Sequence, residues 1–244
     1  MKTQITVVTV GITAASVGEG GPKTISKLTL GNSQLDPIKA IAIVVASDDL
    51  LKAAGPLATN LFAQELSNAV AVETDTRFLA EITSGVSTIP SAGTTAAAIL
   101  QDIGNALGSL IINAQSRVYI AVPPGTAKLW ALTLNGSGTF PALTINGGSI
   151  AGVTVVPTDA LSNLMVAFDA TQLAANSGTI ELDISNQAAI QMDATPDSPP
   201  SASTVATSFW QNNLTGLRAE RYFGVERLRA GAVSMVGSIA NSPA

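Results

Sequence analysis

Residues 16–52 combine three kinds of segment in one continuous run. Three glycines and a proline between residues 18 and 22 favour a sharp turn, because glycine reaches positive φ easily and proline presets the other half of a turn. Two extended runs follow, residues 24–30 and 38–46, with turn-forming residues between them. Residues 47–49, Ser-Asp-Asp, are typical of a helix start. The sequence therefore predicts a long hairpin that leads into a helix.

The composition excludes several classes of function. Only 12% of the 244 residues are charged and 46% are hydrophobic, against a usual charged share of about 25%. This composition indicates either a surface that partners cover or a secreted, fibrous protein. The net charge of −5 argues against a general nucleic-acid surface. The chain has neither cysteine nor histidine, so it lacks disulfides, thiolate chemistry and histidine-based catalysis. No apolar run is long enough for a membrane span and no signal-peptide core is present. We expect a soluble protein with no cofactor, no metal and no membrane partner.

Helical and extended segments alternate along the rest of the chain. Residues 3–15 alternate threonine with β-branched residues and predict a strand near the hairpin. Residues 56–82 repeat apolar positions every three or four residues and predict the longest helix, which Pro56 suits as a first-turn residue. A second helix is expected over residues 96–114. A mixed α+β domain is the expected class.

Short strands predominate in the remaining part of the chain. Residues 117–122 predict a buried strand that two prolines end. Short strands are expected over residues 164–192, and residues 195–203 are rich in proline and serine, which is typical of an exposed connection. The last element, residues 209–237, contains four of the six arginines. These segments predict a strand-rich second half that ends in a charged element.

Four stretches, taken in order, resemble the major capsid proteins of tailed phages with the HK97-type fold. GEGGPKTISKLTL at residues 18–30 is similar to the start of the family's E-loop, and KAIAIVVASDDLL at residues 39–51 to its return strand. NGGSIAGVTVVPTDAL at residues 146–161 resembles a segment of the axial (A) domain, and LTGLRAERYFGVERLRAGAVSMV at residues 214–236 the closing strands of the peripheral (P) domain.

The resemblance implies a domain organisation. Residues 1–15 would form an N-terminal strand and residues 16–46 the E-loop hairpin. Residues 47–85 and 193–244 would form the P domain, with the 56–82 helix as its spine, and residues 86–192 an inserted α/β A domain. The family carries an N-terminal arm before the E-loop, whereas only seventeen residues precede Gly18. We therefore expect that this chain lacks the arm, as a truncated or processed form.

By resemblance, the chain would be a shell protein that self-assembles, through pentamers and hexamers, into an icosahedral phage head. Such a head encloses DNA without binding it sequence-specifically, and other virion proteins are possible partners. The location would be the virion capsid, after assembly in the bacterial host cytoplasm. No enzymatic activity is implied.

The expected intersubunit contacts are charged residues of the E-loop and of the closing strands. An arginine can pair with a carboxylate through two hydrogen bonds, which suits interfaces. Each of these charges can equally well pair within its own subunit or keep an exposed loop soluble. The candidates are Glu19, Lys23, Lys27, Lys39, Arg218, Glu220, Arg221, Arg227 and Arg229.

In the branch of the family that forms covalent cross-links, an E-loop lysine bonds to a neighbour's asparagine with the help of a glutamate. Lys23 and Asn212 match the lysine and the asparagine, but the glutamate position holds Ala219, with Glu220 beside it on the opposite strand face. A charged lysine without a base is a poor nucleophile. Non-covalent contact is therefore the expectation.

Three other functions remain open from the sequence. A nanocompartment shell of the encapsulin type shares the fold, and a β-rich tail or adhesin module fits the content of threonine, serine and glycine. Glu181 and Asp183 lie two residues apart in a predicted strand and would face the same side, as the acidic pair of a glycosidase does. Such pairs are usually polar strand faces.

Overall fold

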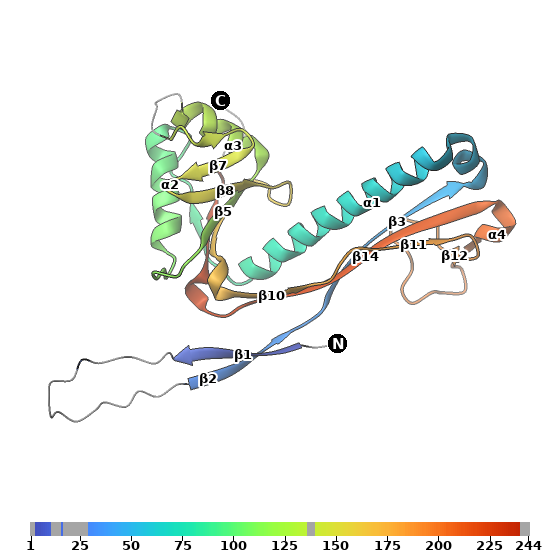
Figure 1. Cartoon of the computed structure of the whole chain (residues 1–244), viewed down its shortest axis with the longest axis horizontal. Helices are drawn as coiled ribbons and strands as arrows, with labels where there is room; N and C mark the ends of the chain where they lie inside the picture. Colours follow the sequence, from blue (N-terminus) through green and yellow to red (C-terminus); the bar gives the residue numbers. More distant parts are fainter. Residues whose placement is uncertain (1–2, 11–15, 17–28, 136–139, 240–244) are drawn as a thin grey trace. The chain divides into compact units, whose positions relative to one another are not determined.

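The computed structural model describes residues 3–10, 16, 29–135 and 140–239. The chain divides into two compact units (Figure 1). Unit 1 comprises Met1–Pro37, Thr76–Asn176 and Gly224–Ala244, and unit 2 comprises Ile38–Asp75 and Ser177–Phe223. Each unit therefore contains segments that are far apart in the sequence.

Unit 1 is built on a seven-stranded mixed sheet with the order β4-β15-β9-β5-β8-β7-β6. Two helices accompany it, α2 (Ala96–Gly108) and α3 (Pro124–Trp130), and a π-helical turn, η1 (Ala131–Asn135), continues α3. Two 3₁₀ turns, η2 (Ala170–Gln172) and η3 (Ala230–Ala232), precede strands. The strands are β4 (Thr88–Pro90), β5 (Val118–Val122), β6 (Leu143–Thr144), β7 (Gly147–Ile150), β8 (Val153–Pro157), β9 (Leu164–Asp169) and β15 (Val233–Gly237).

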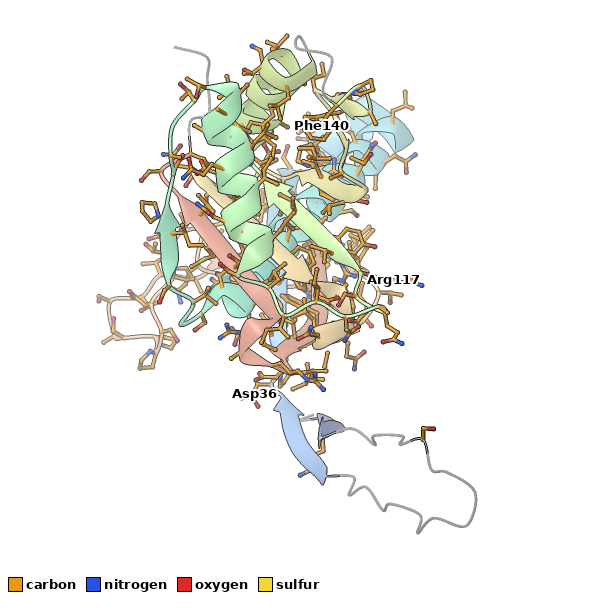
Figure 2. The ribbon with its side chains drawn as sticks, turned by 90° about the vertical axis from the view of Figure 1, so that its left-hand side faces the viewer. Asp36, Arg117 and Phe140 are labelled. Atoms are coloured by element: carbon orange, nitrogen blue, oxygen red, sulfur yellow. The ribbon has the colours of Figure 1, made fainter. Side chains whose placement is uncertain are left out.

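The central strands of this sheet are buried on both faces. In β5, Ile120 contributes to one hydrophobic cluster and Ala121 to another, because successive strand residues point to opposite faces. The first cluster packs α2 and α3 against the sheet, with Phe140 at its border (labelled in Figure 2). The second contains Leu79 and Ile82 from the last turns of the long helix α1 (Asp48–Thr83). Burial on both faces explains why β5 and β9 are almost continuous apolar runs.

Unit 2 contains most of α1 (Asp48–Thr83), up to Asp75, and most of a four-stranded sheet. The long strand β14 (Leu214–Arg227) is the centre of this sheet. It pairs with β3 (Ile38–Ser47) and also with β10 and β11. The strand β10 comprises Leu173–Ser177 and β11 comprises Glu181–Ser185. A small ladder of β12 (Ala189–Ile190) and β13 (Thr207–Ser208) precedes the short helix α4 (Phe209–Asn212). The predicted connection at residues 195–203 lies between β12 and β13.

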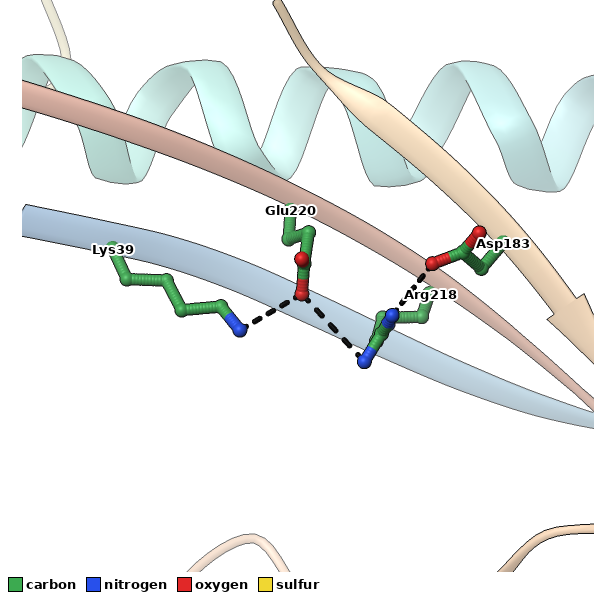
Figure 3. A network of polar contacts seen from close by, with 4 residues as sticks. All are labelled: Lys39, Asp183, Arg218 and Glu220. Carbon is green, nitrogen blue, oxygen red and sulfur yellow. Dashed lines mark hydrogen bonds and ion pairs between the residues drawn. The ribbon is translucent and has the colours of Figure 1, made fainter. Parts of the chain in front are cut away.

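The helix α1 lies along β3 and β14 (Figures 1 and 3). Leu66 and Val70 are buried on the helix, and so are Ala40, Leu217 and Ala219 of the two strands. Small residues in the strands allow the helix to approach the sheet closely. The other strand face, which carries the odd-numbered residues of β3 and the even-numbered ones of β14, points away from α1.

The long helix is present, but it begins earlier than the predicted 56–82. It starts at Asp48 and is interrupted at Gly55, whose φ of 64° is left-handed, so that regular helix resumes at Pro56. Both predicted start signals are therefore used, one for each helical piece. The predicted second helix, residues 96–114, ends instead at Gly108, where Ser109 caps it.

The predicted hairpin pairing is wrong among the described residues. Strand β2 (Thr29–Leu35) pairs antiparallel with β1 (Thr3–Val10), whereas β3 pairs with β14. The physical reason is burial: alternate β3 residues such as Ala40 and Ala46 are buried, and a two-stranded hairpin could not provide this. Residues 24–28 of the predicted first arm lie outside the described residues.

The unit boundaries also differ from the expected domains. Residues 177–192, expected in the A domain, belong to unit 2 because β11 pairs with β14. Residues 224–239, expected in the P domain, belong to unit 1 because β15 lies between β4 and β9 in the seven-stranded sheet. Strand pairing across long sequence separations determines both boundaries.

In the part of the chain that the structure describes, no helix combines the length and apolarity that a membrane crossing requires.

Candidate functional site

Four charged side chains form a row across three strands of unit 2, and we call them the charged row: Lys39, Glu220, Arg218 and Asp183 (Figure 3). Lys39 Nζ lies 2.8 Å from Glu220 Oε2, and Arg218 Nη1 lies 3.6 Å from the same oxygen. Arg218 Nη2 donates to Asp183 Oδ2 at 2.5 Å. Positive and negative charges therefore alternate along the row.

The strand register brings the charged row together. Glu220 lies opposite Ile41 of β3, and Arg218 lies opposite both Ile43 of β3 and Asp183 of β11. Because side chains alternate between faces, residues 218 and 220 share the face that points away from α1. The row is consequently a product of three strands that come from distant parts of the chain.

The local electrostatics stabilise the charged forms. The hydrogen bond to Glu220 raises the pKa of Lys39, and the hydrogen bond to Asp183 raises the pKa of Arg218. Lys39 Nζ also lies 5.2 Å from the centre of the Tyr222 ring, within the range of a cation–π contact. A raised lysine pKa means that this contribution to stability is complete below about pH 10.5. It is lost only as the pH rises through the still higher folded pKa.

Chemically, the row suits recognition of charged partners rather than catalysis. Each carboxylate already neighbours a cation, so no base is poised beside a nucleophile. Among the described residues, no three acidic side chains gather to hold a metal ion. Three large apolar side chains on the same strands are about half exposed, at 45% for Ile41, 52% for Ile43 and 50% for Tyr222. Charge flanked by exposed apolar area is typical of a protein interface.

The other predicted arginines have partners in their own chain. Arg221 donates from Nε to the carbonyl oxygen of Gly178 at 3.0 Å and from Nη2 to Ser177 Oγ. In unit 1, Arg227 donates to the carbonyl oxygen of Ser84. Arg229 immediately precedes the turn η3. The structure therefore joins Lys39, Arg218 and Glu220 in the charged row and does not add Arg221 to it.

Of the two predicted cross-link residues, the structure describes Asn212 but not Lys23. Asn212 is exposed at the end of α4, where its Nδ2 donates to the carbonyl oxygen of Ser208 at 2.8 Å. Lys23, with Glu19 and Lys27, lies outside the described residues. Ala219 is fully buried on the helix side of β14, and Glu220 faces the other way.

The glycosidase alternative finds no support in the geometry. Glu181 and Asp183 share a strand face, but every residue of β11 is exposed. Asp183 is already bound to Arg218, and Glu181 lies opposite Glu220. A glycosidase needs two carboxyl groups free to act on one bond.

The sequence did not reveal two further polar groups, both buried in unit 1. Asp169 accepts hydrogen bonds from Arg117 N, Thr171 N and Gln172 Nε2; Arg117 is labelled in Figure 2. Asp102 accepts from Ser91 Oγ at 2.5 Å and Ala92 N at 2.7 Å. The signal available in the sequence was an aspartate alone among apolar residues. Such a side chain is buried only if it has hydrogen-bond partners, so the pattern predicts a buried polar group.

Replacement of Glu220 by glutamine is expected to lower the unfolding free energy by about 1–2 kcal/mol. Glu220 is nearly buried, with 11% of its side chain exposed, and its loss of charge leaves Lys39 and Arg218 without their shared carboxylate. Chemical denaturation monitored by circular dichroism measures the change. Glu181→Gln is the matched control, because Glu181 lies opposite on an exposed strand. Equal effects of the two changes would contradict a structural role for the charged row.

Two of three comparisons find known proteins that are similar to this chain. No family model matches the sequence. The chain is 31% identical over 245 aligned residues to the capsid polyprotein of Pseudomonas phage PAJU2. The alignment covers 91% of this chain and 37% of the relative. The chain thus spans little more than a third of the length of that relative.

Solved phage structures share the fold. A structure of Gordonia phage Cozz matches 97% of this chain and 81% of its own, with a TM-score of 0.65 and 15% identity. The capsid structure of the cyanophage P-SCSP1u matches 98% and 83%, with a TM-score of 0.61 and 14% identity. The predicted class, an α+β chain with the HK97-type capsid fold, is confirmed. The resemblance to tailed-phage capsid proteins that the sequence predicted is confirmed as well.

Proposed function

We propose that this chain is the major capsid protein of a tailed phage and assembles into an icosahedral shell around the phage DNA. The observation that carries the proposal is the similarity to the phage PAJU2 capsid polyprotein along 91% of the chain. The fold shared with the cyanophage capsid supports it independently. In this role the protein acts by burial of surface and not by turnover, so it is not an enzyme.

The proposed assembly uses the parts of the fold in the following way. The β1–β2 ribbon, with the residues between its strands, is the E-loop that reaches a neighbouring subunit. Unit 2 corresponds to the P domain with α1 as its spine, and most of unit 1 to the A domain that meets its copies around pentamer and hexamer centres. The subunits assemble in the host cytoplasm and remain in the virion. Enclosed DNA is not read by sequence, which the net charge of −5 supports.

The contacts between subunits are proposed to involve the charged row and the E-loop charges. Glu19, Lys23 and Lys27 of one copy meet the P domain of the next, where Lys39, Glu220 and Arg218 offer alternating charges beside exposed Ile41 and Ile43. Arg221, Arg227 and Arg229 add cations along the closing strands. Other virion proteins can use the same surfaces. The encapsulin-type and tail-module alternatives have no observation of their own in their favour.

Assembled particles are expected to dissociate in denaturant into monomers of 24.7 kDa. Glu220 and Ala219 lie on opposite strand faces, so a glutamate is not placed for the asparagine of a lysine cross-link. Denaturing gel electrophoresis of purified particles measures this, with unassembled chain as the control. A ladder of covalent multimers that Lys23→Arg or Asn212→Ala abolishes would contradict the non-covalent contact.

A further inference from the structure

The strand β3 forms a long edge of the sheet in unit 2. Among the described residues it pairs with β14 alone, and its register runs from end to end without a bulge. Just beyond the last pair, Asp48 N donates to the carbonyl oxygen of Asn213 in the same register. Because hydrogen-bonded and non-bonded pairs alternate along an antiparallel ladder, the even-numbered residues of β3 are the ones that bond to β14. The odd-numbered residues therefore direct their N–H and C=O groups outward, to the free edge.

This edge lacks the features that protect other sheet edges from pairing. Proteins usually block an exposed edge by shortness, charge, proline or a bulge. In the two larger sheets, the other edge strands β4, β6, β10 and β11 have five residues or fewer. Of these, β4 ends at Pro90, and β11 carries Glu181 and Asp183. In contrast, β3 has ten residues, no proline and one charged side chain, Lys39. The outer edge of β3 is therefore open to a further strand.

A cleft lies beside the same edge. It has a volume of about 470 Å³, and Ile43, Val45, Ile190, Met192 and Pro196 give it a largely apolar lining. Ile43 and Val45 are odd-numbered, so the outward backbone groups and the cleft belong to the same stretch of β3. A strand that pairs with this edge places alternate side chains beside the cleft. Backbone groups at an open edge and a pocket for alternate side chains are the two parts of a site that binds an added strand.

A second copy of β3 fits this edge in the antiparallel direction. Two antiparallel edges form hydrogen-bonded pairs between residues that both point outward, here the odd-numbered ones. At full overlap, Lys39 lies opposite Ser47 of the second copy, Ile41 opposite its Val45, and Ile43 opposite its Ile43. The contact is then isologous, with a two-fold axis at Ile43.

The side chains of β3 are compatible with this pairing. Lys39 is the only charge of the strand and lies near one end, so the two lysines are far apart and no like charges are opposed. Ile41 and Ile43 are about half exposed, and the second copy covers both. Ile41 of each copy, opposite Val45 of the other, lies beside the cleft of that copy. The edge is thus complementary to itself in charge and in apolar area.

We propose that two copies of this chain pair through the outer edges of their β3 strands, antiparallel and centred on Ile43. The two four-stranded sheets then continue into each other. The pairing rests on the proposed shell function and deepens it, because a shell is built from repeated contacts between copies. It differs from the contact proposed for the charged row, since backbone groups and apolar side chains form it.

Sedimentation velocity over a range of concentration tests the pairing, under conditions in which light scattering detects no particles. The unchanged chain should form a dimer. Ile43→Lys and Ile43→Glu should each weaken the dimer at least about tenfold, because each sets like charges opposite each other at the two-fold axis. An equimolar mixture of the two variants should dimerise again, since lysine then faces glutamate. Circular dichroism verifies that both variants keep the fold.

The matched control is Ile184→Lys, because Ile184 lies in β11 on another edge of the sheet and is 63% exposed. This variant should dimerise as the unchanged chain does. A second measurement uses the lack of cysteine in the chain. Ile43→Cys should give a disulfide-linked dimer on oxidation, because the Cα atoms of a hydrogen-bonded pair lie about 5.5 Å apart, within disulfide range. Ile184→Cys should stay largely monomeric.

An unchanged chain that stays monomeric at every concentration overturns the proposal, and a different strand then covers the edge. A dimer that Ile184→Lys weakens as much as Ile43→Lys does, or that the mixed variants fail to restore, also overturns it. Electron microscopy scores closed particles separately. Particles formed by Ile43→Lys as readily as by the unchanged chain contradict the edge pairing alone, whereas edge-paired dimers that never form particles contradict the shell alone.

Discussion

Replacement of Asp169 by alanine is expected to lower the unfolding free energy by about 3 kcal/mol. Asp169 is fully buried at the end of β9. Its carboxylate accepts the backbone N–H groups of Arg117 and Thr171 and the side-chain amide of Gln172, which in turn donates to the carbonyl oxygen of Ile111. Loss of the carboxylate removes the acceptor of the Arg117 and Thr171 N–H groups and leaves Gln172 Nε2 with the carbonyl oxygen of Ile111 alone, so three segments of unit 1 lose their common anchor.

Chemical denaturation of the Asp169 variant, compared with Asp183→Ala, measures this effect. Asp183 pairs with Arg218, but 58% of its side chain is exposed, and an exposed pair contributes at most about 1 kcal/mol. The comparison therefore distinguishes the stability contributed by buried hydrogen bonds from that contributed by an exposed ion pair. A similar small loss in both variants would show that the Asp169 hydrogen bonds are not needed for stability.

Asp169 also predicts an acid dependence. Burial by itself raises the pKa of this carboxyl, but hydrogen bonds from Ser116, Arg117 and Thr171 outweigh it and lower the pKa from 3.8 to about 2. Because the folded pKa is the lower one, the stabilisation is complete above about pH 4 and disappears as the pH falls to about 2. Asp169→Asn should remove this component of the acid transition.

Replacement of Gly148 by alanine is expected to cost more than about 4 kcal/mol or to prevent folding. Gly148 lies in β7 between β6 and β8. Its φ is 145°, and an added Cβ would lie 2.1 Å from the carbonyl oxygen of Ala142. Since the obstacle is the backbone of the residue that precedes β6, no side-chain rotation relieves it. The yield of soluble protein and the urea unfolding midpoint report the result.

Gly104→Ala is the matched control with the opposite expected sign. Gly104 lies inside α2, and nothing comes within 4 Å of an added Cβ. Alanine should therefore stabilise the chain by about 0.5–1 kcal/mol. If both variants behaved alike, the tight β6–β7–β8 packing would be wrong.

Local patterns predicted most of the individual elements. The spacing of apolar residues after Pro56 identified α1, and the short apolar runs identified β5 and β9. These features depend on neighbours in the sequence, and periodicity records them directly. Even the break at Gly55 corresponds to the two start signals present in the sequence.

Pairing between distant segments could not be predicted in the same way. Lys39 lies beside Glu220 only because β3 pairs with β14. Glu220 is nearly buried because β14 has β3 on one edge and β11 on another. The sequence pattern of β3 is compatible with several partners, and it suggested the preceding strand. Asp183 was considered as one of a catalytic pair because its partner, Arg218, became apparent only once the register was known.

Electron microscopy of the purified chain, alone and with a longer N-terminal segment, tests the central claim most directly. The samples should cover a range of protein concentration, salt and pH, with light scattering to follow assembly. The proposed function predicts closed particles of uniform diameter with pentameric and hexameric units. Persistent monomers under every condition in both forms, with correctly folded protein by circular dichroism, would contradict a capsid role.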